Sequence, residues 1–167
     1  DGALYAYIRD GKGYHAPCYL EITIDGGSSY DRVFTGLLKL PEERTLSGRE
    51  GPTVRFDARG MEERYLQQRI SVLQATFAAQ HAAGYTEADY ISAWLQAAGV
   101  AAGDIVADSG LFVVPWAWVD DESAIEEAWR LAAACGGRLY ADPDGDFRFE
   151  NMAHWQTATR STTTQLA

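Results

Sequence analysis

The chain has 167 residues, of which 47% are apolar and 23% are charged, and its formal net charge is −10. This composition is typical of a soluble globular protein with one domain of ordinary size or two small ones. No apolar run approaches the ~18–20 residues that a membrane-spanning helix needs. The negative charge argues against a nucleic-acid surface, where a basic patch would be expected. Cys18 and Cys135 are too few for a disulfide framework, and we expect both to be reduced and buried.

Residues 1–60 alternate between apolar and polar side chains, which predicts β-strands. We expect these strands at residues 3–10, 18–25, 30–40 and 53–60. A turn cluster at 25–29 and a polar loop at 41–52 would connect them, and Gly36 would mark a bulge or a bend. Strands joined by Gly-rich turns indicate a small barrel or sandwich. Because four strands are few for a closed barrel, we expect the remaining strands to lie outside this chain.

From Met61 onward the apolar spacing changes to that of a helix. A first helix is predicted from Met61 to about Ala83, with Gly84 as its stop. Its apolar stripe consists of Leu66, Ile70, Leu73 and Phe77.

Two more helices are predicted from capping patterns at their starts and glycines at their ends. The second would begin at Thr86 and end at Gly99, and the third would begin at Ser123 and end at Gly136. Their expected buried residues are Ile91, Trp94, Leu95, Ala98, Ile125, Trp129 and Ala132 or Ala133.

The stretch DPDGDFRFE, residues 142–150, resembles both a calcium loop and a strand turn. The glycine and the glutamate do not fall where a calcium loop of the EF-hand type needs them. The flanking segments 138–142 and 146–151 alternate with period two, and Asp144–Gly145 is a favoured hairpin turn. We therefore predict a β-hairpin. The apolar run 110–119 contains Pro115, which places it at a sheet edge or a break.

Three acidic residues, Asp120, Asp121 and Glu122, precede the third predicted helix. A pair of these carboxylates could in principle serve acid–base chemistry. Negative charge at a helix N-terminus also offsets the helix dipole, and side-chain oxygens there cap free N–H groups. We interpret this cluster as a helix cap.

The histidines are His15, His81 and His154. His15 and Cys18 are spaced like two zinc ligands, but no second pair at metal spacing accompanies them. His81 would lie near the end of the first helix, where a cation is favourable. No nucleotide-binding or hydrolase motif is present. We therefore predict no catalytic residue, no metal site and no cofactor.

Four of the five tryptophans divide into two groups. Trp94 and Trp129 lie on predicted helical stripes, so we expect both in the core. Trp116 and Trp118 lie on one side of the Pro115 segment and could belong to the core, to an interface or to a sugar-stacking pair. We favour the core or an interface, because exposed aromatic pairs are rarer than buried ones.

The block from Thr86 to Asn151 has a recognisable order of features: a helix ending in Ala-Gly-Val, a Pro-Trp-x-Trp segment, an acidic cap, a Trp-bearing helix, Gly-Gly and an Asp-Gly hairpin. This order resembles the baseplate or tail hub proteins of tailed bacteriophages, which are related to phage late-control proteins and type VI secretion spikes. The segments AYIRDG, LEITIDGG and VFTGLLKLP are similar to the opening strands of the hub barrel.

The resemblance implies an α+β protein: a partial antiparallel β-barrel segment (1–60), an inserted α/β domain of three helices and a β-hairpin (61–155), and a polar tail (156–167). It also implies a longer parent protein that forms a homotrimer whose barrels continue the tail tube. The expected partners are other hub copies and the tail tube and tail tip proteins, with neither specific nucleic-acid binding nor a membrane. The expected location is the virion, after assembly in the host cytoplasm.

These features lead to one principal function and two alternatives. We expect a structural subunit of the tail hub rather than an enzyme. The first alternative is a carbohydrate-binding or receptor-adhesion module that uses Trp116 and Trp118. The second is a cell-wall hydrolase that uses paired acids such as Asp120 and Glu122.

Overall fold

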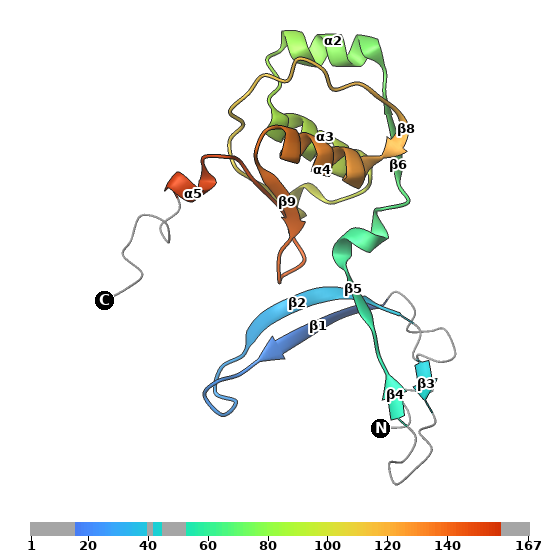
Figure 1. The fold of residues 1–167 in the computed structure, drawn as a ribbon, viewed down its shortest axis with the longest axis vertical. Helices are drawn as coiled ribbons and strands as arrows, with labels where there is room; N and C mark the ends of the chain where they lie inside the picture. Colours follow the sequence, from blue (N-terminus) through green and yellow to red (C-terminus); the bar gives the residue numbers. More distant parts are fainter. Residues whose placement is uncertain (1–15, 40–41, 45–52, 158–167) are drawn as a thin grey trace. The chain divides into compact units, whose positions relative to one another are not determined.

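The computed structural model describes residues 16–39, 42–44 and 53–157 (Figure 1). The predicted strand at 3–10, His15, most of the predicted loop 41–52 and most of the polar tail lie outside the described residues. The chain divides into two compact units. The described part of the first comprises the residues up to Arg64 with the turn 143–145, and that of the second comprises 65–142 and 146–157.

The first unit contains short antiparallel strands. Its larger sheet has the order β1-β2-β5, formed by Pro17–Ile22, Asp31–Leu38 and Ala58–Gly60. A second sheet pairs β3 (Glu42–Arg44) with β4 (Thr53–Arg55). The strands predicted at 18–25 and 30–40 are confirmed. The predicted loop 41–52 was wrong at β3, and the predicted strand 53–60 is broken into β4 and β5, because the two parts pair with different partners.

The predicted turn at 25–29 is confirmed and is organised by one carboxylate. Asp25 accepts hydrogen bonds from the backbone N–H groups of Ser28 and Ser29, each at 3.0 Å, and from the Thr23 hydroxyl at 2.7 Å. The bonds from Ser29, backbone first, and then from Thr23 hold the pKa of this carboxyl well below its usual range. The turn therefore connects β1 to β2 with its own internal hydrogen bonds.

Gly36 is a point of close backbone approach, and of the two predicted roles, a bulge or a bend, the bulge is wrong. It lies opposite Gly60 of β5, and a Cβ atom built there would be 2.1 Å from the carbonyl oxygen of Arg59. The irregularity in this pair of strands is instead in β1, between Leu20 and Glu21. Only glycine allows β5 to come this close to β2.

Replacing Gly36 with alanine should therefore disrupt the β2–β5 pairing. We expect a destabilisation of about 1–3 kcal/mol, because the backbone must shift to admit the methyl group. Urea unfolding followed by the amide NMR signals of β2 measures it. As a control, Gly103→Ala should change stability by less than about 0.5 kcal/mol, since no atom lies within 4 Å of the added Cβ. Equal stability of the two variants would contradict the close approach.

The largest departure from the predicted elements lies at residues 61–83. The single helix expected from Met61 to Ala83 is wrong: the segment forms a 3-10 turn, the strand β6 (Arg69–Val72) and the helix α2 (Gln74–Ala82). Ile70 and Val72 have the alternation of a strand, and β6 pairs with the distant strand β8 (Val119–Ser123). That pairing overrides the local helical spacing. The predicted stop at Gly84 is confirmed by its φ of 78°.

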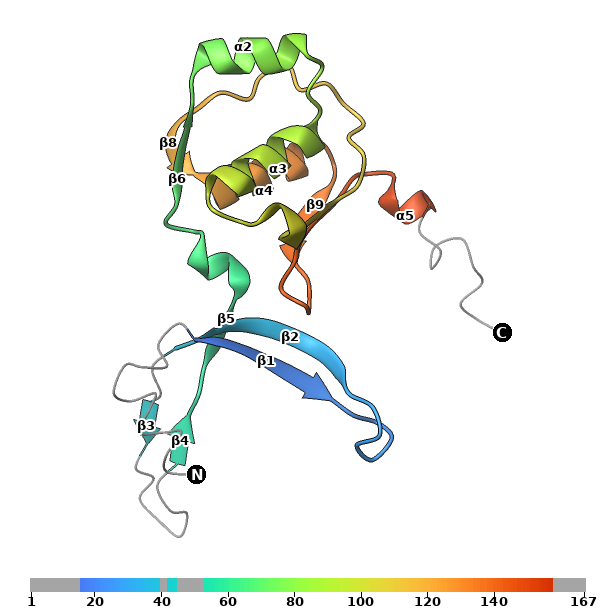
Figure 2. The ribbon, with the colours of Figure 1, turned by 180° about the vertical axis from the view of Figure 1, so that it is seen from behind.

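The core of the second unit lies between two helices that pack side by side in both views, α3 (Glu87–Ala97) and α4 (Ala124–Ala134) (Figure 1, Figure 2). Both predicted helices are confirmed. The Thr86 backbone N–H and hydroxyl bond to the Asp89 carboxylate, and Ser123 caps α4. The fully buried apolar side chains include Tyr90, Ile91, Leu95, Ile125, Phe147 and Phe149.

The two helical tryptophans differ in burial. Trp94 is 4% exposed, as predicted, but the prediction for Trp129 was wrong, because its side chain is 36% exposed. The small Ala128, fully buried, occupies the core position on α4 instead. Small side chains there allow the two helices to approach closely.

The predicted hairpin is confirmed as β9 (Arg138–Ala141) and β10 (Phe147–Glu150). A third strand, β7 (Ile105–Ala107), pairs with β10 in parallel and was not predicted. Gly145 in the turn has a φ of 96°, which fits the expected role of glycine there. A one-turn helix, α5 (His154–Thr157), follows.

The fold class is mixed α+β, as predicted. The described residues form three α-helices of 9 to 11 residues, a one-turn helix and four small sheets. None of these sheets closes into a barrel.

Candidate functional site

The segment from 108 to 118 is irregular and is held in place by a buried carboxylate. Glu87, at the start of α3, is 1% exposed. Its two oxygens accept the backbone N–H groups of Leu111 and Phe112, each at 2.8 Å. A charged acceptor makes hydrogen bonds about twice as strong as a neutral one. This residue therefore fixes the loop that leads to Trp116 and Trp118.

Trp116 and Trp118 are exposed, at 62% and 40%, so they are not core residues. Their ring centroids lie 5.6 Å apart with an interplanar angle of 67°, an edge-to-face contact. Trp116 also contacts Phe77 of α2, with centroids 6.1 Å apart. The contact between the two indole rings and the contact with Phe77 therefore hold this exposed pair in place.

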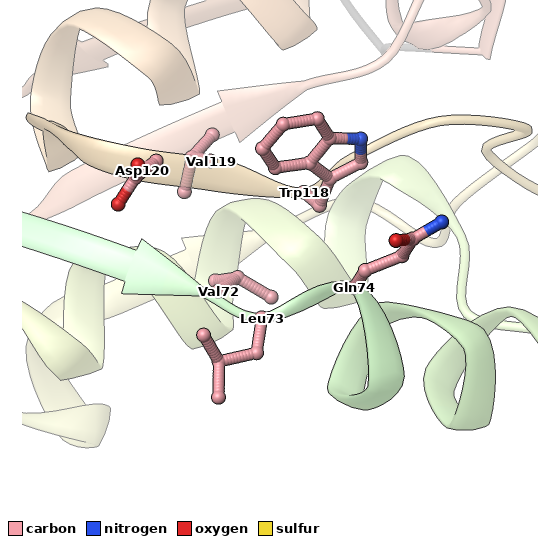
Figure 3. A pocket seen from close by; sticks show the side chains of 6 residues that line it. All are labelled: Val72, Leu73, Gln74, Trp118, Val119 and Asp120. Atoms are coloured by element: carbon pink, nitrogen blue, oxygen red, sulfur yellow. The ribbon is translucent and has the colours of Figure 1, made fainter.

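A cavity of about 180 Å³ lies beside Trp118. Figure 3 shows two chain segments running past each other at this place, one from the end of β6 into α2 and the other from Trp118 into β8. The lining residues are Val72, Leu73, Gln74, Trp118, Val119 and Asp120. Four of the six are apolar, and the polar groups at the cavity are one amide and one carboxylate.

A second hollow, of about 230 Å³, lies on the α4 side and shares Trp118 and Val119 with the first. Trp94, Trp116, Glu127 and Arg130 also line it. Leu73, at the first cavity, is 71% exposed. We call the surface made by Leu73, Trp116, Trp118 and Asp120 together with the two hollows the aromatic groove. Exposed aromatic and aliphatic groups of this kind mark binding surfaces.

The acidic cluster was predicted as a helix cap, and this is wrong for its carboxylates. Asp120, Asp121 and Glu122 belong to β8, and the cap of α4 is Ser123, whose hydroxyl accepts the N–H of Glu126 at 3.5 Å. Asp121 has a φ of 50°, and its backbone N–H bonds to the Ser71 hydroxyl at an irregularity of the β6–β8 pairing. All three carboxylates are exposed.

The described histidines have structural contacts. His81 lies in the last turn of α2, as expected, and its Nδ1 donates to the carbonyl oxygen of Val114 at 2.9 Å. His154 Nδ1 lies 2.8 Å from an Asp108 carboxylate oxygen. Within the part of the chain that the structure describes, no group of three or more His, Cys, Asp or Glu residues could hold a metal ion.

Both cysteines are free thiols and are only partly buried, which corrects the expectation of full burial. Partial burial raises the pKa of each thiol, so the unreactive protonated form is favoured.

Glu150 on β10 is the centre of a polar network in the second unit. The Tyr140 hydroxyl donates to it at 2.7 Å, the Arg138 guanidinium pairs with it, and His154 Nε2 lies 3.4 Å away. Burial alone would raise the pKa of this carboxyl, but the bonds from Arg138 and Tyr140 outweigh it and lower the pKa. The network joins β9, β10 and α5, and its chemistry is that of a structural ion pair.

The carboxylate of Asp142, at the hairpin turn, also bonds to groups within the hairpin. It accepts the N–H of Asp146 at 3.1 Å and pairs with Arg148 at 2.7 Å. These contacts fit the predicted hairpin turn rather than a calcium loop.

Two residues important to the groove were missed in the sequence. The helical spacing predicts Leu73 in a core stripe, and no local pattern marks Glu87, since an acidic residue in a first helical turn normally faces solvent. No protein-family model, curated protein or solved structure matches this chain. Among the described residues, every helix is too short or too polar to span a lipid bilayer.

Proposed function

We propose that this chain is a structural component of a phage tail baseplate hub that connects the tail tube to the tail tip through protein–protein contacts. The observation that carries the proposal is the apolar surface of the β1–β2–β5 sheet. Its exposed apolar side chains are Tyr19, Leu20, Ile22 and Val33, and Ile24, Tyr30 and Phe56 are exposed next to its strands. Tyr19 and Leu20 are consecutive residues of β1, so the exposed apolar groups lie on both faces of the sheet. Exposed apolar groups on so small a sheet favour a protein neighbour that covers them.

The sheet also offers strand edges for pairing. In the described residues, β1 pairs with β2 alone and β5 pairs with β2 alone, so each strand has one edge without a partner strand. In a hub, strands of neighbouring segments would complete the barrel at these edges. This completion corresponds to the proposed division into a barrel segment, 1–60, an inserted domain, 61–155, and a tail, 156–167.

The charge fits such an assembly. A formal net charge of −10 keeps the unassembled protein soluble and would discourage DNA from adhering to a hub that conducts it. The proposal therefore includes homotrimeric hub copies in a longer parent protein, tail tube and tip proteins as partners, and the virion as location, without catalysis.

Mixing the purified chain with the tail-tube protein encoded in the same genome should give a complex of defined stoichiometry, measured by size exclusion with light scattering. Leu20→Asp should weaken this complex at least ~10-fold, because it places a charge within the apolar contact. Leu20 is 56% exposed, so the variant should still fold.

Gln96→Glu is the matched control, since it adds one negative charge at an exposed position of α3. The role in the hub is contradicted if no complex forms with the tube or tip proteins. It is also contradicted if the gene lies far from the tape-measure and tail-tube genes.

The exposed tryptophans favour one alternative, a carbohydrate-binding or adhesion module. An edge-to-face pair does not form one flat platform, so a sugar would stack on a single ring. Saturable binding of a cell-wall oligosaccharide that Trp116→Ala removes would support this alternative over the hub. For the hydrolase, Asp120 is the only carboxylate among the residues lining the cavity beside Trp118, and Glu122 does not line it.

A further inference from the structure

The cavity beside Trp118 has the size of one side chain. Sites for small-molecule ligands usually enclose ~300–1,000 Å³, and this cavity encloses about 180 Å³. A whole metabolite or sugar ring with its substituents would not be enclosed. One long side chain from another protein fits the space better.

The residues that line the cavity indicate which type of side chain it would bind. Leu73, Val72 and Trp118 offer apolar contact along the cavity, and the Asp120 carboxylate supplies a negative charge in its lining. Lysine and arginine combine an apolar stem with a cationic head, and such side chains bury the stem while the head stays near water. A cation beside an indole ring also gains from the ring quadrupole.

The charges around the aromatic groove also favour a lysine or arginine side chain. Asp121 and Glu122 are exposed next to Asp120 on β8. Arg69 donates to the neutral carbonyl oxygen of Asp121 at 2.8 Å and keeps its positive charge, whereas Arg130 pairs with the Glu127 carboxylate. Because three carboxylates, Asp120, Asp121 and Glu122, outnumber the Arg69 cation, we expect a negative field at the cavity mouth. A second copy of a chain with a net charge of −10 is therefore a poor occupant.

We propose that the cavity beside Trp118 binds a basic side chain of a neighbouring protein, with its stem along Trp118 and its cation at Asp120. The inference rests on the proposed role in protein–protein contact and names the chemistry of one partner. The partner carries an exposed arginine or lysine on an apolar surface.

Titration of the intact chain with N-acetyl-arginine amide, followed by the indole N–H signal of Trp118, tests the cavity alone. We expect saturable shifts at millimolar concentration, and weaker binding of N-acetyl-norleucine amide, which has an apolar stem without the charge. Asp120→Asn should weaken the arginine amide ~3- to 5-fold, the range of a solvated ion pair, and leave the norleucine amide unchanged.

Glu122→Gln is the matched control, because it removes the same charge from the same strand outside the cavity lining. Equal weakening by both variants would assign the effect to diffuse charge and overturn the proposal. Equal affinity of the two amides would also overturn it. Because the amides need no partner protein, a failed tube complex with an intact titration would count against the hub role alone.

Discussion

Replacing Glu87 with alanine should lower the free energy of unfolding by about 3 kcal/mol, because two backbone N–H groups lose a charged acceptor. These are the N–H groups of Leu111 and Phe112, each 2.8 Å from a Glu87 oxygen. Glu87 is 1% exposed, so water does not readily replace the lost carboxylate. Urea unfolding with linear extrapolation measures the change.

Glu87→Gln measures how much one of the two hydrogen bonds contributes to the free energy of unfolding. The amide offers one oxygen acceptor and turns an N–H₂ group toward the other backbone N–H, so we expect about half of the loss in the alanine variant. The loop from 108 to 118 should become more mobile in both variants, and the Trp116 and Trp118 signals should broaden or shift. Unchanged tryptophan signals in Glu87→Ala would mean that the carboxylate does not hold this loop.

Truncating Trp94 to alanine should cost about 3–5 kcal/mol, the range for a large buried aromatic side chain. Trp94 is 4% exposed, and its ring lies 6.0 Å from that of the fully buried Tyr90. The same change at Trp129 should cost clearly less, about 1–3 kcal/mol, because this ring is 36% exposed and buries less apolar surface.

The two variants remove the same side chain from two helices that pack against each other. The difference between their losses in the free energy of unfolding therefore measures the effect of burial. Thermal unfolding of both, at equal protein concentration, gives the comparison. A loss for Trp129→Ala as large as that for Trp94→Ala would contradict the structure and restore the original expectation of two core tryptophans.

Helices α3 and α4 could be predicted because their boundaries depend on nearby residues. Thr86 and Ser123 cap their starts, and Gly99 and Gly136 have the positive φ that ends a helix. The hairpin turn is local in the same way, because Gly145 supplies the required backbone conformation.

Strands β6 and β7 could not be predicted, because each is only three or four residues long and depends on a distant partner. The spacing of Ile70, Leu73 and Phe77 fits a helix as well as a strand followed by a helix. Only the pairing of Ile70 with Glu122 decides between them.

The sequence drew attention to two residues of the candidate site but not to their exposure. The interface interpretation singled out Trp116 and Trp118 from composition and from Pro115. Leu73 joins them only because β6 pairs with β8, and such an approach of two segments some fifty residues apart is not readable from local patterns.

The parallel pairing of β7 with β10 has a consequence for the order of folding. Val106 lies opposite Arg148 in this sheet, so β7 gains its partner only when the long segment between them, which includes α4, is closed into a loop. Contacts that close such long loops form slowly, because chain entropy is lost before the pairing compensates it. A chain still growing from the ribosome could form α3 early, but the sheet beneath it would be completed only after Phe149 had emerged.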